Sequence, residues 1–473
     1  MVTFSGGAFL VAFALKLGAS NLIIGLLSAI PPLMQLLQIP SIYLIEKIRN
    51  RRSIVVYSGF LHRLAILLTA LIPFIDTSKW GLFLLVTSLF LQGAFLSTLM
   101  CAWNSWMRDL VPGNQLGSYF SKRMRLMTAF GLPISLLAGW FIDFYKDKFP
   151  QYEIYGYSVL FFLGFIAGLT GVYFLSKTEE PKMMDNKEKL NWIEMIKMPF
   201  KDENYRKLLF FLGSWNFAIN LSAPFFTVYL LMRLKLDMIL VISFTVLSQI
   251  MYFIFLKIWG RISDHLSNKS VLSLSGPLFI ICILGWTFTT MPEKYWATIP
   301  LLVLLHILMG ISTAGVNLSS SNIALKLAPN DKATSYLAVN SFISSIAAGI
   351  APILGGTFAD FFARRELSLV FKWKSPAREL LINTMNFQYW DFFFILSFMI
   401  GLYALHRLAR VKEVGEVGEK VVINEFFSEI AFMMKNLSTA DGLRQMVIFP
   451  FSHLKHIARD RYRRNKRKKI SHV

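Results

Sequence analysis

The sequence has few of the residues from which catalytic and metal centres are built. Its 473 residues include only 2 cysteines and 7 histidines, and Cys101 and Cys282 lie far apart inside apolar segments. That spacing matches neither a metal site nor a disulfide framework. The chain contains no glycine-rich loop ending in Gly-Lys-Ser/Thr, no His-Glu-x-x-His and no Cys-x-x-Cys. These absences exclude ATP as the driving force, favour a protein that is not an enzyme and predict no cofactor.

Charge is also scarce. Only 16% of the residues are charged and 55% are hydrophobic, whereas soluble domains have about 25% charged and about 45–50% apolar residues. The apolar residues come in blocks of about 20, the length that crosses a hydrocarbon core as a helix. One such block could be a signal peptide, but so many cannot all be. The composition therefore predicts an integral membrane protein.

Twelve apolar segments can be recognised, and each is long enough for a helix. Since a single exposed strand cannot span lipid, the sequence predicts an all-α membrane protein with twelve transmembrane helices. The approximate segments are 1–17, 22–45, 53–75, 80–107, 124–144, 154–176, 208–232, 238–259, 271–291, 297–323, 335–361 and 388–407.

An internal repeat divides these segments into two sets of six. The stretch LVPGNQLGSYF at 110–120 returns as LAPNDKATSYL at 327–337, so the numbering is offset by 329 − 112 = 217. The same offset carries one set of six helices onto the other, so we predict two pseudo-symmetric six-helix bundles with a site between them, an architecture of transporters. The matching pairs include Leu110/Leu327, Pro112/Pro329, Tyr119/Tyr336, Gly139/Gly356 and Asp143/Asp360.

Four regions follow from the repeat. We predict an N-terminal six-helix bundle at 1–176, a cytoplasmic linker at 177–206, a C-terminal six-helix bundle at 207–407 and a basic cytoplasmic tail at 408–473. The seventh segment begins near Lys207, and 207 − 217 falls before Met1. The first helix therefore lacks about ten residues that its counterpart has, so we expect either a truncated first helix, a misplaced start or a repeat that diverges there.

The net charge of +21 could suggest nucleic acid, but the positions of the charges argue against that partner. Basic residues gather in the loops after the even-numbered helices and in the tail, as cytoplasmic loops do. Both termini are thus predicted to be cytoplasmic in a plasma-membrane protein, although the basic loop after helix eleven disagrees. In the tail, Val422, Phe426, Ile430 and Met433 have helical spacing and RDRYRRNKRKK follows. We expect either a helix on the inner leaflet with a basic patch on anionic lipids or a disordered tail.

Two loops resemble the signature of the major facilitator superfamily, Gly-x-x-x-Asp-Arg-x-Gly-Arg-Lys between helices two and three. GRISDHLSNKSVLSLSG at 260–276 fits it at Gly260, Asp264 and Lys269, and YLIEKIRNRRSIVVYSG at 43–59 is a weaker copy. SLFLQGAF at 88–95 resembles the fourth-helix pattern Arg-x-x-Gln-Gly, with leucine in place of the arginine. The resemblance implies a cytoplasmic latch formed by charged loop residues, unless these are ordinary solvated charges. The candidates are Glu46, Lys47, Arg51, Asp264 and Lys269.

The resemblance also implies that helices one, four, seven and ten line a central cavity. Amide and hydroxyl groups there would bind polar solutes and tryptophans would stack on flat faces, although each residue could equally form an interhelical hydrogen bond. The candidates are Ser5, Gln92, Trp103, Asn104, Trp215, Asn216, Asn220, Ser222, His306 and Asn317.

Arg63 is the one strong charge well inside a helix. A charge near the bilayer centre costs at least about 2.5 kcal/mol, so Arg63 needs a partner, water or an anionic substrate. The 28 Asp and Glu fall in loops, linker, tail or near helix ends. Since a mid-membrane acid is the common proton carrier, coupling to H+ would have to use His306, an end carboxylate or the substrate itself.

The sequence therefore favours a secondary transporter that moves a small organic solute by alternating access, as a monomer, driven by H+ or another ion or by facilitation alone. The alternative is a non-transporting membrane receptor or assembly factor on the same scaffold, which would use the tail to bind a partner.

Overall fold

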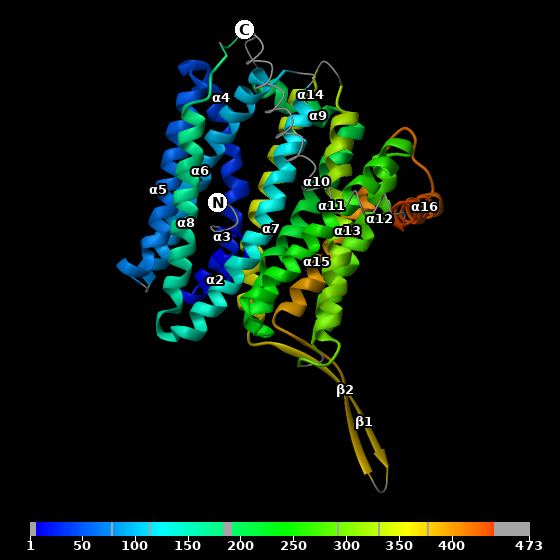
Figure 1. Ribbon diagram of the computed structural model, residues 1–473. Coiled ribbons are helices and arrows are strands. Elements are labelled where there is room, and N and C mark those ends of the chain that lie inside the picture. The colour runs from blue at the N-terminus through cyan, green and yellow to red at the C-terminus, as the bar shows by residue number, and fades with distance from the viewer. Residues whose placement is uncertain are drawn as a thin grey trace.

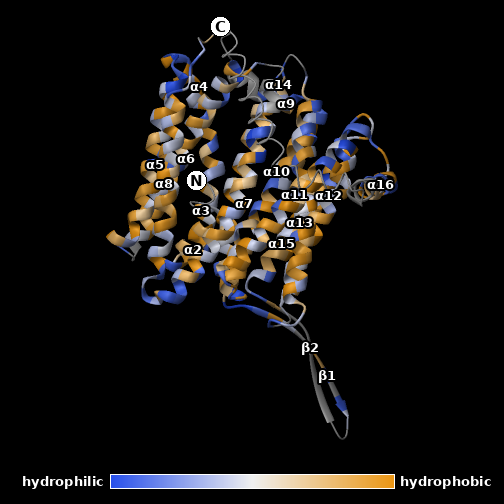
Figure 2. Ribbon diagram, viewed as in Figure 1, coloured by the Kyte–Doolittle hydropathy of each residue, from blue (hydrophilic) through white to orange (hydrophobic). Residues whose placement is uncertain are grey.

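The computed structural model describes residues 6–76, 79–112, 115–181, 183, 192–290, 293–329, 332–375 and 378–438. Within these ranges, 11 helical segments are long and apolar enough to cross a membrane. A further apolar helix, α2, has only 10 residues. Apolar residues dominate the middle of the long helices, and hydrophilic residues gather at both ends (Figure 2). The predicted all-α membrane fold is confirmed, with a first helix that is short in the described region.

The first half of the chain supplies the first six segments. Its second segment is a helix with a short 3-10 turn, η1, between two α-helical parts. The elements are α2 (Gly7–Lys16), α3 (Asn21–Met34), η1 (Gln35–Leu37), α4 (Gln38–Ile48), α5 (Arg51–Ile75), α6 (Lys79–Leu110), α7 (Leu116–Lys148), η3 (Pro150–Tyr152) and α8 (Glu153–Ser176).

The second half repeats this order after a short linker helix and adds a hairpin and a tail helix. The elements are α9 (Trp192–Lys201), α10 (Glu203–Val228), η4 (Tyr229–Arg233), α11 (Met238–His265), α12 (Asn268–Gly285), η5 (Trp286–Thr289), α13 (Thr298–Leu327), α14 (Ala333–Phe362), β1 (Glu366–Ser375), β2 (Arg378–Gln388), α15 (Trp390–Ala409) and α16 (Glu419–Ser438).

The bundle has two distinct ends (Figure 1). The linker helix α9 lies at one end, called here the linker end, and the antiparallel pair β1–β2 projects from the other, the hairpin end. The sequence predicted only a basic loop after helix eleven, so this hairpin is a correction. Apolar residues alternate along β1, the pattern of a strand with one apolar face, and Leu367 pairs with Phe387 and Phe371 with Ile382.

The structure reproduces the repeat in its turns. Helix α6 ends at Leu110 and α13 at Leu327, again with an offset of 327 − 110 = 217. Beyond them, the carbonyl of Pro112 accepts a hydrogen bond from the Gln115 N–H at 2.8 Å, and that of Pro329 accepts one from the Lys332 N–H at 3.0 Å. The motif that occurs twice in the sequence therefore forms the same turn at the same place in each half.

The two halves meet at the hairpin end. Helix α3 packs on α14 and α7 packs on α11. A Cβ atom at Gly356 would overlap with the backbone of Asn21 and Leu22, so only glycine permits this close approach of α14 to α3. One buried apolar cluster contains residues from both halves, such as Phe13 and Phe225. The hairpin end is thus closed by contacts between the halves.

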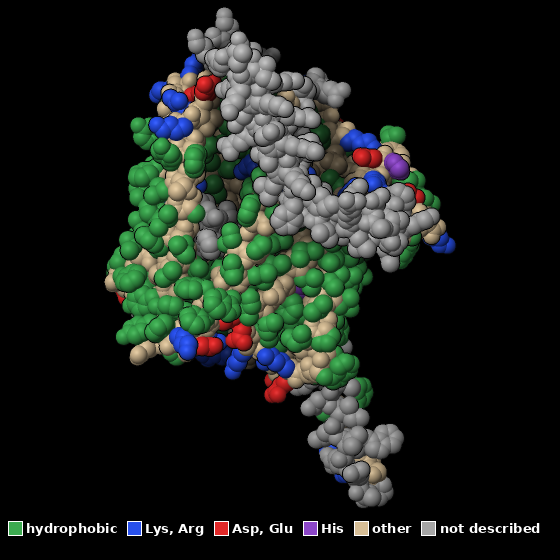
Figure 3. All heavy atoms as spheres, viewed as in Figure 1, with side chains coloured by type: hydrophobic (Ala, Val, Ile, Leu, Met, Phe, Trp, Pro, Cys, Tyr) green, Lys and Arg blue, Asp and Glu red, His purple; other side chains and the backbone are tan. Residues whose placement is uncertain are grey.

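The linker end is open. Residues 121–127 of α7 are all exposed. Apolar clusters near this end stay separate, one around Trp106 in the first half and one around Trp259 in the second. A hollow lies between the halves on the same side (Figure 3). The conformation is therefore closed toward the hairpin and open toward the linker.

Candidate functional site

A pocket of about 290 Å³ lies in the second half, between α10, α11, η5 and α13. We call it the second-half pocket. It is lined by aromatic and neutral polar side chains. The lining residues are Phe226, Thr227, Leu230, Thr245, Ser248, Gln249, Tyr252, Trp286, His306, Met309, Gly310 and Thr313.

Helical spacing explains how these residues come together. On α11, positions 245, 248, 249 and 252 follow the i, i+3, i+4, i+7 pattern of one helix face. Positions 306, 309, 310 and 313 of α13 follow the same pattern. The two faces approach closely because position 310 is glycine, where a Cβ atom would overlap with the Ser248 carbonyl. Ser248 also donates from Oγ to the His306 carbonyl at 2.9 Å, which fixes the register of α11 against α13.

One wall of the pocket is aromatic. The rings of Phe226 and Trp286 are stacked, with centroids 4.4 Å apart and planes at 22°. Tyr229 meets Trp286 edge-on and donates or accepts hydrogen bonds with Thr289 and Thr290 beside it. These contacts hold the indole of Trp286 in place, so the pocket presents a preformed aromatic surface.

His306 is buried between rings and has a defined tautomer. Its imidazole stacks on Phe244 at 4.9 Å, and its Nδ1 lies 2.8 Å from the carbonyl of Leu302. A carbonyl can only accept, so Nδ1 carries the proton in this contact. Nε2 is then the ring nitrogen left for a ligand, and in the neutral imidazole it is an acceptor.

The predicted amide residues of helices seven and ten lie on the faces that lead to this pocket. Asn216 and Asn220 precede Thr227 by 11 and 7 positions on α10, and Asn317 follows Thr313 by 4 on α13, so each shares a face with a lining residue. All three are at least partly exposed. The amides of Asn216 and Asn220 donate to carbonyls one turn earlier, those of Leu212 and Asn216. The side-chain carbonyl oxygens of Asn216 and Asn220 remain available to accept hydrogen bonds from a solute.

Gln92 has a different environment. It is 9% exposed, and its amide donates to Thr69 Oγ1 and Ser88 Oγ, both at 3.0 Å. The repeat relates Thr69 and Gln92 to Trp286 and Met309, where the indole N–H donates to Met309 Sδ at 3.3 Å. Gln92 therefore ties helix four to helix three in the first half, as Met309 does for the equivalent helices in the second.

The remaining cavity candidates are dispersed. Trp215 packs in the second-half core on Phe279, and Trp103 packs on Phe120 with the Arg123 guanidinium over its ring. Asn104 is exposed on α6. Ser222 is buried and accepts from Ser397 at 3.1 Å. Ser5 lies outside the described residues.

Arg63 lies on α5, away from the second-half pocket. Its guanidinium contacts Nδ1 of the neighbouring His62, and its buried Nε has no hydrogen-bond partner. Helix α5 packs on α6 and α8 within the first half. The structure therefore separates Arg63 from His306 rather than joining them in one site.

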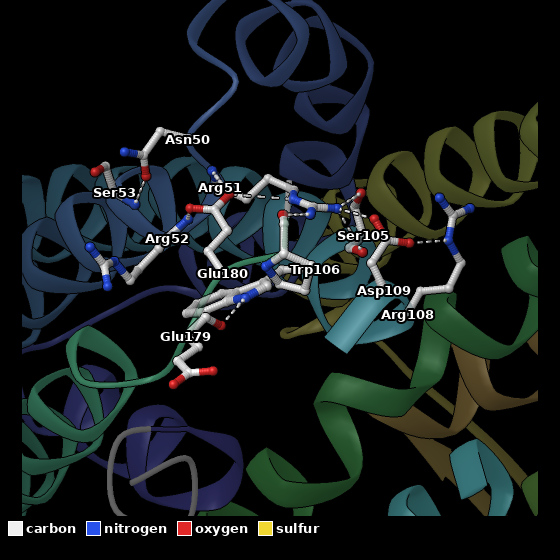
Figure 4. Close-up of polar contacts among 11 residues, drawn as sticks. Asn50, Arg51, Arg52, Ser53, Ser105, Trp106, Arg108, Asp109, Glu179 and Glu180 are labelled. Atoms are coloured by element: carbon white, nitrogen blue, oxygen red, sulfur yellow. Dashed lines mark hydrogen bonds and ion pairs between the residues drawn. The ribbon is translucent and has the colours of Figure 1, made fainter. Parts of the chain in front are cut away.

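Of the predicted latch residues, Arg51 is the most engaged (Figure 4). Its side chain is only 1% exposed and pairs with Asp109 at 2.5 Å. Glu180, beyond helix six, accepts from the backbone N–H groups of Arg51 and Arg52 at 2.6 and 3.1 Å. A carboxylate at a helix N-terminus is favoured by the helix dipole, so Glu180 binds the start of α5.

In the second half, a glutamate binds the start of the equivalent helix, α12, in the same way. Glu413, beyond helix twelve, accepts from the Lys269 N–H at 2.7 Å and from the Asn268 amide at 2.9 Å. The repeat relates positions 268 and 269 to 51 and 52. The Lys269 ammonium also pairs with Glu416 at 2.8 Å, which lowers the pKa of that carboxyl. These contacts join helices within one half, whereas Glu46, Lys47 and Asp264 are exposed.

Sequence reasoning missed the α11 face and Trp286. The expectation that helices one, four, seven and ten line the cavity left out helices eight and nine. The missing signal was present in the sequence: Thr245, Ser248, Gln249 and Tyr252 place four polar groups on one face of a helix that is otherwise strongly apolar. Among the described residues, no group of three or more His, Cys, Asp or Glu could hold a metal ion.

The family model described as Major Facilitator Superfamily matches residues 1–352 and 244–407. None of the curated protein sequences searched matches this chain. Solved structures that are similar include the nucleoside transporter NupG, with a TM-score of 0.59 and 12% identity over 87% of this chain and 97% of that one. The xylose transporter XylE from E. coli, in an inward open conformation, has a TM-score of 0.58 and 13% identity over 90% and 96%.

A bacterial homologue of the iron transporter ferroportin in the inward-facing state has a TM-score of 0.56 and 13% identity over 86% of this chain and 96% of that one. At these identities the likenesses concern the fold alone.

Proposed function

Since the chain belongs to the major facilitator superfamily, we propose that it is a secondary transporter that moves a small organic solute across the plasma membrane by alternating access. The observation that carries the proposal is the second-half pocket, which combines an aromatic wall with polar groups beside the faces that carry Asn220 and Asn317. Ligand pockets commonly lie between the helices of a bundle, as this one does.

The asymmetry of the two ends supports alternating access. Contacts between the halves close the hairpin end, and the linker end is open. Basic loops such as that with Lys47, Arg49 and Arg52 lie at the linker end, which supports a cytoplasmic position for this end by the positive-inside rule. The described conformation is then inward-open, and both termini are cytoplasmic. Two of the similar structures are described as inward open and inward-facing.

Coupling to an ion is part of the proposal. The second-half pocket has no Asp or Glu in its lining, so a coupled proton would have to use His306, a carboxylate at a helix end or the solute itself. A sodium ion would have to use hydroxyl and carbonyl oxygens. A pH jump across proteoliposomes, compared with a sodium gradient, separates these cases from facilitation.

The tail is proposed to contact lipid rather than a second subunit, and we expect a monomer. Helix α16 packs on α11 and α12 and leaves Val421 and Phe427 exposed, at 49% and 63%. An amphipathic helix with exposed apolar side chains beside a bundle is suited to the membrane interface. The basic stretch RDRYRRNKRKK, which lies outside the described residues, would add attraction to anionic inner-leaflet lipids.

Flux measurements in proteoliposomes test the transport proposal. We expect solute uptake that is lowered by His306→Ala and Asn220→Ala, and unchanged by Ser243→Ala. Ser243 lies on α11 but is not among the lining residues, and its hydroxyl donates to the Ile239 carbonyl one turn earlier. Absence of flux for every solute that the purified protein binds would favour the alternative, a receptor on this scaffold.

A further inference from the structure

We infer that the second-half pocket takes an uncharged ring compound that carries several O–H or N–H hydrogen-bond donors. This inference rests on the proposed function, because it names the class of solute for the same pocket.

The charge of the solute follows from the lining. The twelve lining residues include no Asp, Glu, Lys or Arg. Burying an ionised group without a counter-charge costs far more than burying a neutral polar group. Arg63 could pair with an anion, but it lies on α5 in the other half and is not part of this lining. A charged solute would therefore be excluded from the pocket.

The hydrogen bonds already made within the protein determine what the solute must supply. Three lining groups have their donor occupied: Thr245 Oγ1 donates to the Val241 carbonyl at 3.1 Å, Ser248 Oγ to the His306 carbonyl and His306 Nδ1 to the Leu302 carbonyl. What remains on these three groups are lone pairs, on two hydroxyl oxygens and on Nε2. These three groups bind donors, and a solute with acceptors alone would leave their lone pairs unsatisfied.

Gln249 lies between Thr245 and Tyr252 on the same face of α11 and is exposed. Its amide offers one acceptor and two donors, so it can bind a group that both donates and accepts, such as a hydroxyl or a ring amide. The solute therefore carries at least one such group next to its donors.

The aromatic wall determines the shape. Phe226 and Trp286 form a stacked pair, and Tyr252 is a further lining ring. A flat ring or the apolar face of a saturated ring packs on such a surface better than a flexible chain. The volume of about 290 Å³ lies at the lower end of the range of ligand pockets, which suits one or two rings. Nucleosides and monosaccharides both have this chemistry.

Binding to the full-length purified protein tests the inference. The probes are uridine and D-xylose, which are uncharged, uridine 5′-monophosphate and D-xylonate, which are anions, and the fully O-methylated xyloside, which has no donor. We expect uridine or D-xylose to bind by isothermal titration calorimetry, and their charged or methylated counterparts to bind at least about tenfold more weakly. Binding of uridine alone identifies an N–H heterocycle, and binding of D-xylose alone identifies a polyol. No binding by either one overturns the inference.

Two substitutions assign the binding to this pocket. Thr245→Val keeps the side-chain volume but removes an acceptor, and Gln249→Leu removes the amide. We expect each to weaken binding by about tenfold, with an unchanged melting temperature, and Ser243→Ala to leave binding unaltered. Unchanged affinity in both pocket variants would overturn the inference, as would tighter binding of the anions.

Flux measurements distinguish failure of this inference from failure of the proposed transport function. If uridine or D-xylose binds in this pocket but gives no flux in proteoliposomes, the inference about the ligand stands and the transport proposal fails. If only anions are transported, and their flux depends on Arg63 but not on Thr245, the transporter stands and the inference fails.

Discussion

Asp143 and Asp360 are related by the repeat, and each one binds the start of a helix in the opposite half. Asp143, near the end of α7, accepts from the N–H groups of Met238 and Ile239 at 2.8 and 2.7 Å. Asp360, near the end of α14, accepts from those of Asn21 and Leu22 at 3.2 and 3.0 Å. The donors obey the same offset, since 238 − 21 = 217. Two equivalent caps therefore hold the hairpin end closed.

Neutralising both caps should open the hairpin end. Asparagine has one acceptor oxygen and no charge, so it loses the interaction with the helix dipole. At about 0.3–1 kcal/mol for each cap, D143N with D360N should shift the population toward the outward-open state by about threefold to thirtyfold. Spin labels placed at the hairpin ends of α3 and α14 and read by double electron–electron resonance would report the separation.

The matched control for this prediction is D147N, since Asp147 is exposed one turn further along α7. It should leave the distance distribution unaltered. An unchanged distribution in the double variant as well would mean that apolar packing alone closes this end.

Substitutions of Gln92 and His306 should separate effects on protein stability from effects on solute binding. Q92A removes three contacts inside the first half and should lower the free energy of unfolding by about 1–3 kcal/mol, with little change in the solute KM. H306A should raise KM at least about tenfold, because Nε2 faces the solute in our proposal. Thermal unfolding and initial rates of uptake measure the two effects; a raised KM in Q92A with unaltered stability would contradict this division.

Arg51 should be a major contributor to stability in the first half. Its guanidinium is buried, and its two terminal nitrogens donate to Asp109, the Ser105 carbonyl and the Pro181 carbonyl. R51A would leave the two carbonyls without this donor and Asp109 with Arg108 alone. Because Asp109 is itself 32% exposed, we expect a loss of about 1–3 kcal/mol. R52A, at an exposed neighbouring position, should cost little. Melting temperatures of the purified variants check the contrast, and equal losses would show that burial of Arg51 is unimportant.

Phe426 should dock α16 on the bundle. Its ring stacks on Trp259 with centroids 4.6 Å apart, and Arg261 pairs with Glu429 beside it. F426A should release the helix, so that amides 419–438 exchange with deuterium faster than in the parent protein. F427A changes an adjacent ring that is 63% exposed and serves as the control. Equal exchange in the two variants would indicate that the polar contacts alone hold α16.

The features that depend on composition and on the repeat could be predicted from the sequence. Apolar length predicted the helices, and the constant offset predicted the two sets of six helices. His306 could be singled out because a polar side chain inside an apolar helix is costly without a partner, and His306 does line the pocket. The roles of all the predicted site residues, His306 included, stay predictions.

The rest depended on long-range contacts that no local pattern contains. Gln92 is polar in an apolar helix like His306, but its partner Thr69 lies on another helix, and spacing along α6 cannot reveal it. The family resemblance put Arg51 in a loop latch, yet its partner Glu180 comes from 129 positions further along the chain. The hairpin could not be distinguished from a loop in the sequence. The alternation of apolar and polar residues along β1 is short, includes lysines and is interrupted by a bulge at Leu369/Val370.

The hairpin β1–β2 also offers a binding site for an external marker. It projects from the bundle at the end opposite the linker helix, as a narrow arm of two strands (Figure 1). Membrane proteins of this size offer few landmarks for aligning single-particle images, because most of their mass is hidden in the micelle. A nanobody raised against the arm would serve as a fiducial marker and, applied to intact cells, would reveal which side of the bilayer it faces.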